Sequence, residues 1–456
     1  MELLSGCQPQ SECPHRVSGG CAVVVAEVQQ KPPSHLRQSG AGLIKPPLAA
    51  KLASNHPDGF ARLADELGER TFLAFLNFQE LTCMKKKLIA MAVAGLASGA
   101  ALAQTNVTMY GVLDLAYVYS SGSAGLVGGR NTFSGLTGVG AGNRLGFKGE
   151  EALGNGLKAV FTLEYGLDPD INQGVGTGGL NARQQFVGLA GNFGTVALGR
   201  QYAPGFNATA RNDALDASDM AIQSSLSALN GYTITPNSPA RFNNSITYTS
   251  NNLSGFTVSA IYGFGETGDG FGGFNDRVVS TSDNGKLGFG LNYANGPINL
   301  DAVYQSRQNV TPAGFPAGAG KDINEWYVGG SWDFKVVKLY GSYQALDNKN
   351  DILAVAVDES DLWTVGVTAP IGPGTLGVSY GRLVTDRSLV QDGESWGAGV
   401  QYTYPLSKRT SLYGAYSYFD NNRHVLVPGQ VIAVPGIVGA AGESNYAVGA
   451  GITHSF

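Results

Sequence analysis

The stretch Lys286-Leu287-Gly288-Phe289-Gly290-Leu291-Asn292-Tyr293 alternates large apolar side chains with small or polar ones. Successive side chains of a β-strand point to opposite faces, so this alternation predicts a strand with one apolar and one polar face. Residues Ser245–Thr249 repeat the pattern as Ser-Ile-Thr-Tyr-Thr. The sequence therefore favours a sheet that separates an apolar medium from a polar one.

Similar segments follow one another from Gln104 to the end of the chain. Sixteen candidate strands begin near Asn106, Gly142, Gly156, Ala182, Gly194, Ala240, Gly255, Gly285, Pro297, Asp322, Lys335, Ser360, Gly374, Glu394, Thr410 and Glu443. Their connections are alternately short, as at Gly191–Gly194, and long, as at Ser120–Ala141. Short turns on one side and long loops on the other are typical of an outer-membrane barrel. We therefore expect an all-β fold, a 16-stranded antiparallel transmembrane β-barrel.

The composition agrees with this expectation. The chain holds 65 glycines and only 14% charged residues, against about 25% in typical globular proteins. A soluble β-sandwich would also alternate, but it would keep its outer face polar. Here the apolar face continues along nearly the whole chain after Gln104, which favours the barrel over the sandwich.

The part of the chain before Gln104 has a different character. Met84 and three lysines precede the apolar stretch Leu88–Leu96, and Ala101-Leu102-Ala103 follows. This order is typical of a cleavable signal peptide, and the apolar run is too short for a transmembrane helix. We expect residues 84–103 to be a signal peptide, 104–456 the barrel, and 1–83 an extraneous upstream segment from a mis-assigned start.

Cysteine placement limits the chemistry of the barrel. All four cysteines precede Met84, at Cys7, Cys13, Cys21 and Cys83. A disulfide framework or a cysteine-based metal site is therefore excluded after that point. We expect neither a metal site nor a cofactor.

The end of the chain is a further amphipathic strand that finishes on Phe456. In a closed barrel the last strand must pair with the first, because this removes both unpaired edges. A terminal phenylalanine on such a strand resembles the recognition signal of the outer-membrane assembly machinery. We expect Phe456 to serve as this assembly signal.

Several stretches resemble the general diffusion porins of Gram-negative bacteria, in the branch common in β-proteobacteria. They are Val107–Asp114, Asn143–Gly154, Ala182–Leu189, Gly194–Tyr202 and Gly451–Phe456. The resemblance implies an outer-membrane homotrimer whose water-filled channels pass small hydrophilic solutes by passive diffusion. It implies contact with outer-membrane lipids, lipopolysaccharide and the assembly machinery. It also implies that the third long loop, here Pro204–Pro239, folds into each barrel.

The same resemblance implies a basic cluster on the barrel wall, at Arg144, Arg183 and Arg241. Alternation places Arg144 and Arg241 in the lumen, because Leu145 and Phe242 next to them are expected to face lipid. For Arg183 the alternation is less regular. Opposite this wall the inward loop offers Asp213, Asp216 and Asp219. A basic wall facing an acidic loop would set the selectivity of the constriction.

Other charges also fall on the lumen face by alternation, namely Lys148, Glu150, Lys286, Asp301 and Arg307. The alternative is that all these charges are ordinary solvated groups of the lumen and loops. Ten of the 30 basic and eight of the 35 acidic residues precede Gln104, which leaves 20 basic and 27 acidic residues and a formal charge of −7. This balance argues against nucleic-acid binding and leaves open whether anions or cations are preferred.

Two other classes of barrel protein are alternatives to a channel. A barrel hydrolase needs a general base, and only His424 and His454 follow the signal segment. No second element of a catalytic site accompanies either histidine, so we expect no enzyme. A non-conducting anchor would have a small or plugged barrel, whereas sixteen strands enclose an aqueous channel.

Overall fold

The computed structural model describes most of the chain after residue 105. The described residues are 106–123, 130–140, 142–171, 181–229, 231–265, 283–310, 320–349, 359–386, 391–422, 434–435 and 441–456. The upstream segment and the expected signal peptide lie outside them. Among the described residues, no helix combines the length and the hydrophobicity that crossing a membrane requires.

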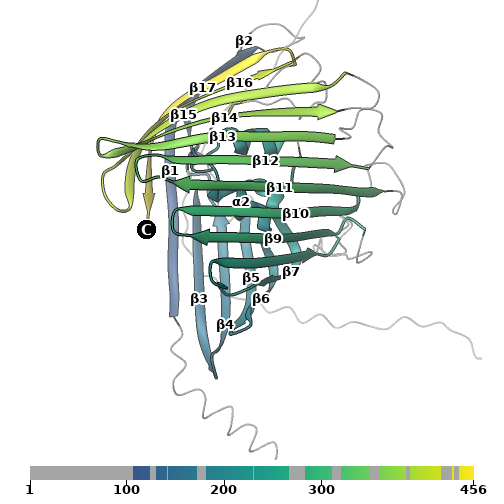
Figure 1. Cartoon of the computed structure of the whole chain (residues 1–456). Helices are drawn as coiled ribbons and strands as arrows, with labels where there is room; N and C mark the ends of the chain where they lie inside the picture. The colour runs from purple at the N-terminus through teal and green to yellow at the C-terminus, as the bar shows by residue number, and fades with distance from the viewer. Residues whose placement is uncertain are drawn as a thin grey trace, which may run out of the picture. The chain divides into compact units, whose positions relative to one another are not determined.

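Seventeen strand segments form one antiparallel sheet. They are β1 (Asn106–Ser123), β2 (Arg130–Thr137), β3 (Arg144–Gly154), β4 (Leu157–Gly166), β5 (Asn181–Gly191), β6 (Gly194–Tyr202), β7 (Arg241–Thr249), β8 (Phe256–Gly263), β9 (Lys286–Asn295), β10 (Ile298–Val310), β11 (Lys321–Asp333), β12 (Lys338–Asn348), β13 (Glu359–Ile371), β14 (Gly374–Asp386), β15 (Gly393–Pro405), β16 (Thr410–Asn421) and β17 (Ser444–Ser455). Consecutive strands pair, and β17 returns to pair with β1 from Val112↔Ser455 to Gly122↔Asn445. The sheet is therefore a closed barrel (Figure 1).

The seventeen segments make sixteen barrel strands, because the second strand is interrupted. β3 pairs with the first part of β1, and β2 pairs with its last part. The carboxylate of Asp114 accepts hydrogen bonds from the backbone N–H groups of Val139 (3.2 Å) and Gly140 (2.8 Å). These bonds divert the chain between β2 and β3. The expected strand number is confirmed, but the expectation that Ser120–Ala141 is all loop was wrong.

The outer face of the barrel is apolar and the inner face is polar, as alternation predicts. In β11, Trp326 and Val328 are 58% and 62% exposed, whereas the alternating residues Glu325 and Tyr327 are 0% and 2% exposed. The exposed residues belong to the face that meets lipid. The buried residues belong to the inner face, where something within the barrel covers them.

The cover is the connection between β6 and β7, which contains α2 (Pro204–Arg211), α3 (Ile222–Leu229) and the short 3₁₀ helix η2 (Ser238–Ala240). Pro204 occupies the first turn of α2, where its missing N–H costs no hydrogen bond. α2 contacts β8 to β11, and α3 contacts β13 to β15. Both helices therefore lie against the inner face of the barrel (Figure 1).

Glycines make room for this loop on the barrel wall. A Cβ atom added at Gly377 of β14 would lie 2.4 Å from the carbonyl oxygen of Ala214, and one at Gly399 of β15 would lie 2.8 Å from Leu215. Leu215, Ile222 and other fully buried loop side chains pack into this smooth surface. Glycines thus stand in the wall from β13 to β15 at the points where the loop lies closest to the strand backbone.

Candidate pore constriction

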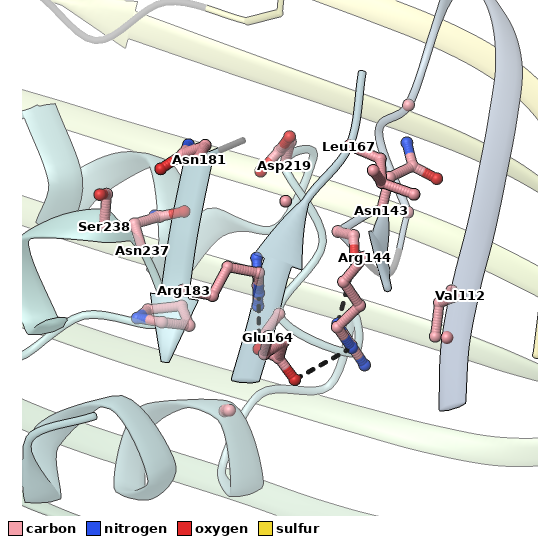
Figure 2. A pocket seen from close by; sticks show the side chains of 18 of the residues that line it. Val112, Asn143, Arg144, Glu164, Leu167, Asn181, Arg183, Asp219, Asn237 and Ser238 are labelled. Carbon is pink, nitrogen blue, oxygen red and sulfur yellow. Dashed lines mark hydrogen bonds and ion pairs between the residues drawn. The ribbon is translucent and has the colours of Figure 1, made fainter. Parts of the chain in front are cut away.

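Three arginines from alternate strands line one cavity of about 750 Å³, and two of them, Arg144 and Arg183, are labelled in Figure 2. The three are Arg144 of β3, Arg183 of β5 and Arg241 of β7, the three residues expected to form the basic wall. The strands that carry them lie on the side of the barrel that the loop does not cover. The structure therefore brings the whole predicted basic cluster together.

Arg241 reaches the cavity by a route that simple alternation does not describe. Phe242 was expected to face lipid, but it is fully buried and packs with Ala203 and Ile261 on the inner side. The register between β6 and β7 shifts between Gly199 and Gln201, and Asn244 has a left-handed backbone with φ of 45°. An extra residue of this kind re-aims the side chains that flank it.

A carboxylate that the sequence analysis did not single out lies beneath the arginines. Glu164 of β4 is 4% exposed and accepts hydrogen bonds from Tyr110 Oη (2.9 Å), from Arg183 Nε (2.9 Å) and from Tyr202 Oη. Arg144 Nε lies 4.0 Å from its other oxygen (Figure 2). Alternation along β4 could have found it, because Lys158, Thr162 and Glu164 share the polar face.

Arg241 differs from the other two arginines, because no carboxylate pairs with it among the described residues. It is only 9% exposed, and its Nε atom has no hydrogen-bond partner there. Its guanidinium lies 6.0 Å from the centroid of the Tyr202 ring. The cavity therefore holds one buried cation whose charge Glu164 does not balance.

The loop supplies the opposite side of the cavity. Asp216 and Asp219 both line it, together with Ala217, Asn237 and Ser238. The backbone N–H of Asp219 donates to the carbonyl oxygen of Val139 at 3.0 Å, which ties the loop to the link between β2 and β3. Two of the three predicted loop aspartates thus face the basic wall.

The position of these aspartates inside the barrel changes their acidity, although both side chains are exposed to the cavity. Desolvation by the surrounding protein raises the pKa of Asp219 to about 6, because the effect of Arg183 and Arg241 only partly opposes this desolvation and the nearby Asp114. Desolvation also raises the pKa of Asp216. Asp213 does not line the cavity; it is 6% exposed, and its Oδ1 accepts the N–H of Leu215 at 2.7 Å. Burial raises its pKa to about 7.

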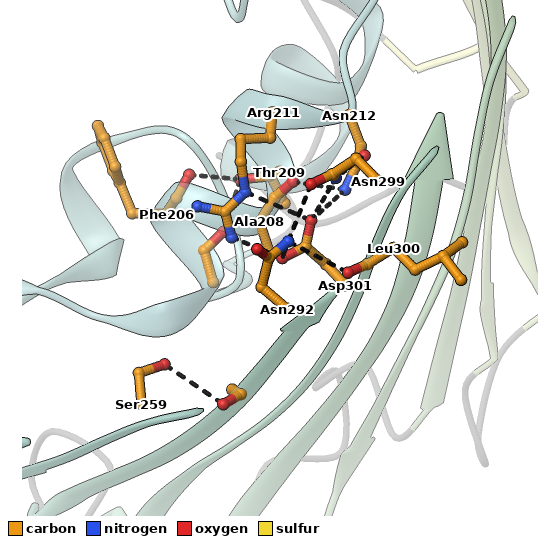
Figure 3. A network of polar contacts seen from close by, with 12 residues as sticks. Phe206, Ala208, Thr209, Arg211, Asn212, Ser259, Asn292, Asn299, Leu300 and Asp301 are labelled. Carbon is orange, nitrogen blue, oxygen red and sulfur yellow. Dashed lines mark hydrogen bonds and ion pairs between the residues drawn. The ribbon is translucent and has the colours of Figure 1, made fainter. Parts of the chain in front are cut away.

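Two of the secondary lumen charges hold the loop in place. Asp301 of β10 bonds Arg211 Nη2 (2.5 Å) and Asn212 Nδ2 (2.8 Å) at the end of α2 (Figure 3). Arg307 Nη2 lies 3.1 Å from Glu325. Glu325 in turn accepts the backbone N–H groups of residues 233 and 234 at 2.7 and 2.9 Å. Asp301 and Arg307 therefore serve the anchoring of the loop.

The other secondary charges lie outside the cavity. Lys148 Nζ lies 5.3 Å from the ring centroid of Tyr110, and Lys286 Nζ lies 5.2 Å from that of Phe242. Glu150 forms an exposed ion pair with Lys158 at 2.9 Å, which contributes little to stability. These charges belong to other parts of the lumen surface.

The terminal residue closes the barrel. The N–H of Phe456 donates to the carbonyl oxygen of Gly111 at 3.1 Å, and the reverse bond, from the N–H of Gly111 to the carbonyl oxygen of Phe456, is 3.2 Å long.

The described residues contain no group of three metal-ligating side chains. His454 pairs with Thr410 through Nδ1 at 2.9 Å, and His424 lies outside the described residues.

Comparison with known proteins identifies the family. The sequence profile described as Gram-negative porin matches residues 90–424. The chain belongs to the Gram-negative porin family. Outer membrane porin protein 32 of Delftia acidovorans is 33% identical over 377 residues, which cover 82% of this chain and all of the relative. An outer membrane porin protein of Bordetella pertussis is 29% identical over 74% of this chain and 95% of its own length.

The solved structures agree with this assignment. The anion-selective porin from Comamonas acidovorans is 29% identical and has a TM-score of 0.62, covering 77% of this chain and all of its own. In-vitro folded OmpT of Vibrio cholerae, at 15% identity and a TM-score of 0.53, shares the fold alone. The porin is therefore an outer-membrane channel protein, which confirms the expected class and the expectation that it is no enzyme.

Proposed function

We propose that this porin passes small hydrophilic solutes and ions by diffusion and prefers anions to cations. The observation that carries the proposal is the convergence of Arg144, Arg183 and Arg241 on one cavity. A similar solved structure is that of an anion-selective porin. Selectivity of this kind arises because charges in a confined space are weakly screened.

The charges of the cavity are divided between its two sides. Glu164 offsets one of the three arginines of the wall. Asp168, Asp216 and Asp219 also line the cavity, so the proposal rests on where the arginines lie and not on an excess of positive charge. The pKa of Asp219 is raised to about 6, so part of its negative charge is lost at mildly acidic pH. The arginines and the acidic loop opposite them set up a transverse field.

The decisive experiment is the reversal potential of single channels in a planar bilayer under a salt gradient. The wild type should favour chloride. One unit charge about 6 Å from a passing ion, at an effective dielectric constant of about 40, changes the energy of that ion by about 1.4 kcal/mol, or its permeability by about tenfold, with opposite signs for anions and cations. Replacing Arg144, Arg183 and Arg241 with Gln should therefore reverse the preference.

The matched control is Arg382→Gln. Arg382 lies on the outer-facing side of β14 and pairs with Glu394 at 2.8 Å, so its loss should leave the reversal potential unchanged. A cation-selective wild type, or a triple variant with the wild-type potential, would contradict the proposal.

We further propose a homotrimer that contacts outer-membrane lipids and lipopolysaccharide, with Phe456 as its assembly signal and residues 84–103 as its cleaved leader. The family resemblance supports these proposals. Conductance that rises in three equal steps would support the trimer. A mature N-terminus at Gln104, measured by mass spectrometry, would support the leader; peptides from residues 1–83 in cells would contradict the mis-assigned start.

A further inference from the structure

An aromatic plate lies beside the arginines of the constriction. The rings of Tyr202, at the end of β6, and Phe206, in the first turn of α2, are stacked with centroids 3.8 Å apart and planes 5° apart. Both residues line the cavity, as does Ala210 one helical turn after Phe206. The side of the cavity formed by α2 is therefore apolar, while the barrel wall is cationic.

The plate is fixed by its neighbours. Tyr202 donates its hydroxyl hydrogen to Glu164 and accepts a hydrogen bond from Arg183 Nε at 3.1 Å. The backbone N–H of Phe206 donates to the carbonyl oxygen of Ala203 at 3.0 Å. Phe206 extends away from the polar network around Asp301 that anchors the other end of α2 (Figure 3). The half-buried ring of Phe206 is thus fixed by its neighbours and takes no part in the polar network around Asp301.

Two arginines lie beside this plate. Arg183, 5.9 Å from the centroid of the Tyr202 ring, is already bonded to Glu164. Arg241 lies 6.0 Å from the same centroid and lines the cavity, and among the described residues no carboxylate forms an ion pair with it. The site therefore combines an arginine without an ion-pair partner in the described part of the chain with a rigid aromatic surface. A guanidinium group binds carboxylates well, and an aromatic surface favours an offset-stacked second ring.

We propose that the constriction contains a subsite for aromatic carboxylates, with Arg241 opposite the carboxylate and Phe206 against the ring. This inference rests on the proposed anion preference and adds to it a selectivity among anions. An aliphatic carboxylate of equal charge and similar size gains the same attraction to Arg241. It lacks the ring quadrupole that makes aromatic pairs favourable beyond the area they bury.

The test compares benzoate with cyclohexanecarboxylate as blockers of the chloride current through single channels. The two anions have the same charge and similar size, and only benzoate is aromatic. Benzoate should bind about 2- to 12-fold more tightly in the wild type, the range measured for aromatic pairs. Phe206→Leu should make the two anions equal, whereas Phe206→Tyr should keep the difference.

Phe289→Leu is the matched control, because Phe289 is 50% exposed on the outer face of β9. It should keep the benzoate preference of the wild type. Equal block by the two anions in the wild type, or a preference that survives Phe206→Leu, would overturn the subsite. A wild-type reversal potential of the wrong sign would instead overturn the proposed function, so the two failures are distinguishable.

Discussion

The two sides of the barrel interior use similar polar residues for opposite purposes. From β3 to β7, the arginines that point inward line an open cavity. From β10 to β12, Asp301, Glu325 and Gln344 also point inward, but each is bound to the third loop and buried. An inward charge is therefore a pore charge only where the loop leaves the wall uncovered.

The largest expected effect is on the covered side, at Glu325. This residue is 0% exposed, accepts two backbone N–H groups of the loop and pairs with Arg307. Glu325→Gln leaves Arg307, whose side chain is 22% exposed, without its counter-charge, and breaking a buried pair costs up to about 3–5 kcal/mol. We expect a loss of that size in the free energy of unfolding, measured with a denaturant in micelles, and noisier single-channel currents.

Glu151→Gln is the control for Glu325→Gln, because Glu151 is exposed near the turn after β3. It should leave the stability and the current noise of the porin unchanged. If Glu325→Gln matched this control in unfolding free energy and in current noise, Glu325 would not anchor the loop, and the distinction between anchoring carboxylates and pore carboxylates would be contradicted.

The glycine surface under the loop should give the next largest effect. In Gly377→Ala the new methyl group would lie 2.4 Å from the carbonyl oxygen of Ala214, so the loop or the wall must shift. Overpacking of this kind costs about 1–3 kcal/mol. We expect a lower unfolding free energy and an altered conductance. Gly414→Ala, where the nearest atom would be 3.9 Å away, should change neither quantity.

Much of the architecture was predictable from the sequence, because lipid on one face and water on the other impose a strict alternation. Lys286–Asn295 is a strand with Phe289 outside, as its pattern predicts. The failures occur where a local contact overrides the alternation. Asp114 interrupts the second strand by bonding the backbone of residues 139 and 140, and the bulge at Asn244 turns Phe242 inward.

The site was predictable only in part. Alternation and resemblance found the three arginines, but the partners of each lumen charge depend on the path of the loop. Arg211 of α2 pairs with Asp301 of the barrel wall, and the alternation that identifies strands could not predict this helix. Asp213 is buried beside Leu215, although it was expected to face the basic wall together with Asp216 and Asp219.

On the uncovered side, Glu164→Gln separates charge from scaffold. Gln keeps the shape of the side chain and can still accept a hydrogen bond, but it removes the negative charge beneath Arg144 and Arg183. We expect the anion preference, measured from the reversal potential, to rise several-fold, since Glu164 is partly screened by the residues that bond it. An unchanged preference would mean that Glu164 acts only as a scaffold for the arginines.

The smallest expected effect is a pH dependence carried by Asp219. Its pKa is raised to about 6 by desolvation and by Asp114, with Asp168 contributing, and it faces Arg183 and Arg241. Because the acid form is neutral, the cavity becomes more positive as the pH falls below about 6. The anion preference should therefore rise between pH 7 and pH 5, by less than the tenfold expected for a full unit charge close to the ion.

Two aspartates of the loop provide the matched comparison for this titration. Asp219→Asn should hold the anion preference near its acidic value at both pH values, because the group can no longer ionise. Asp213 has a pKa of about 7 but does not line the cavity, so Asp213→Asn should retain the pH dependence of the wild type. The opposite result would be that Asp213→Asn abolishes the pH dependence of the anion preference and Asp219→Asn does not. A buried loop carboxylate would then control the pore through the packing of the loop, and the distinction between pore charges and buried charges would not hold.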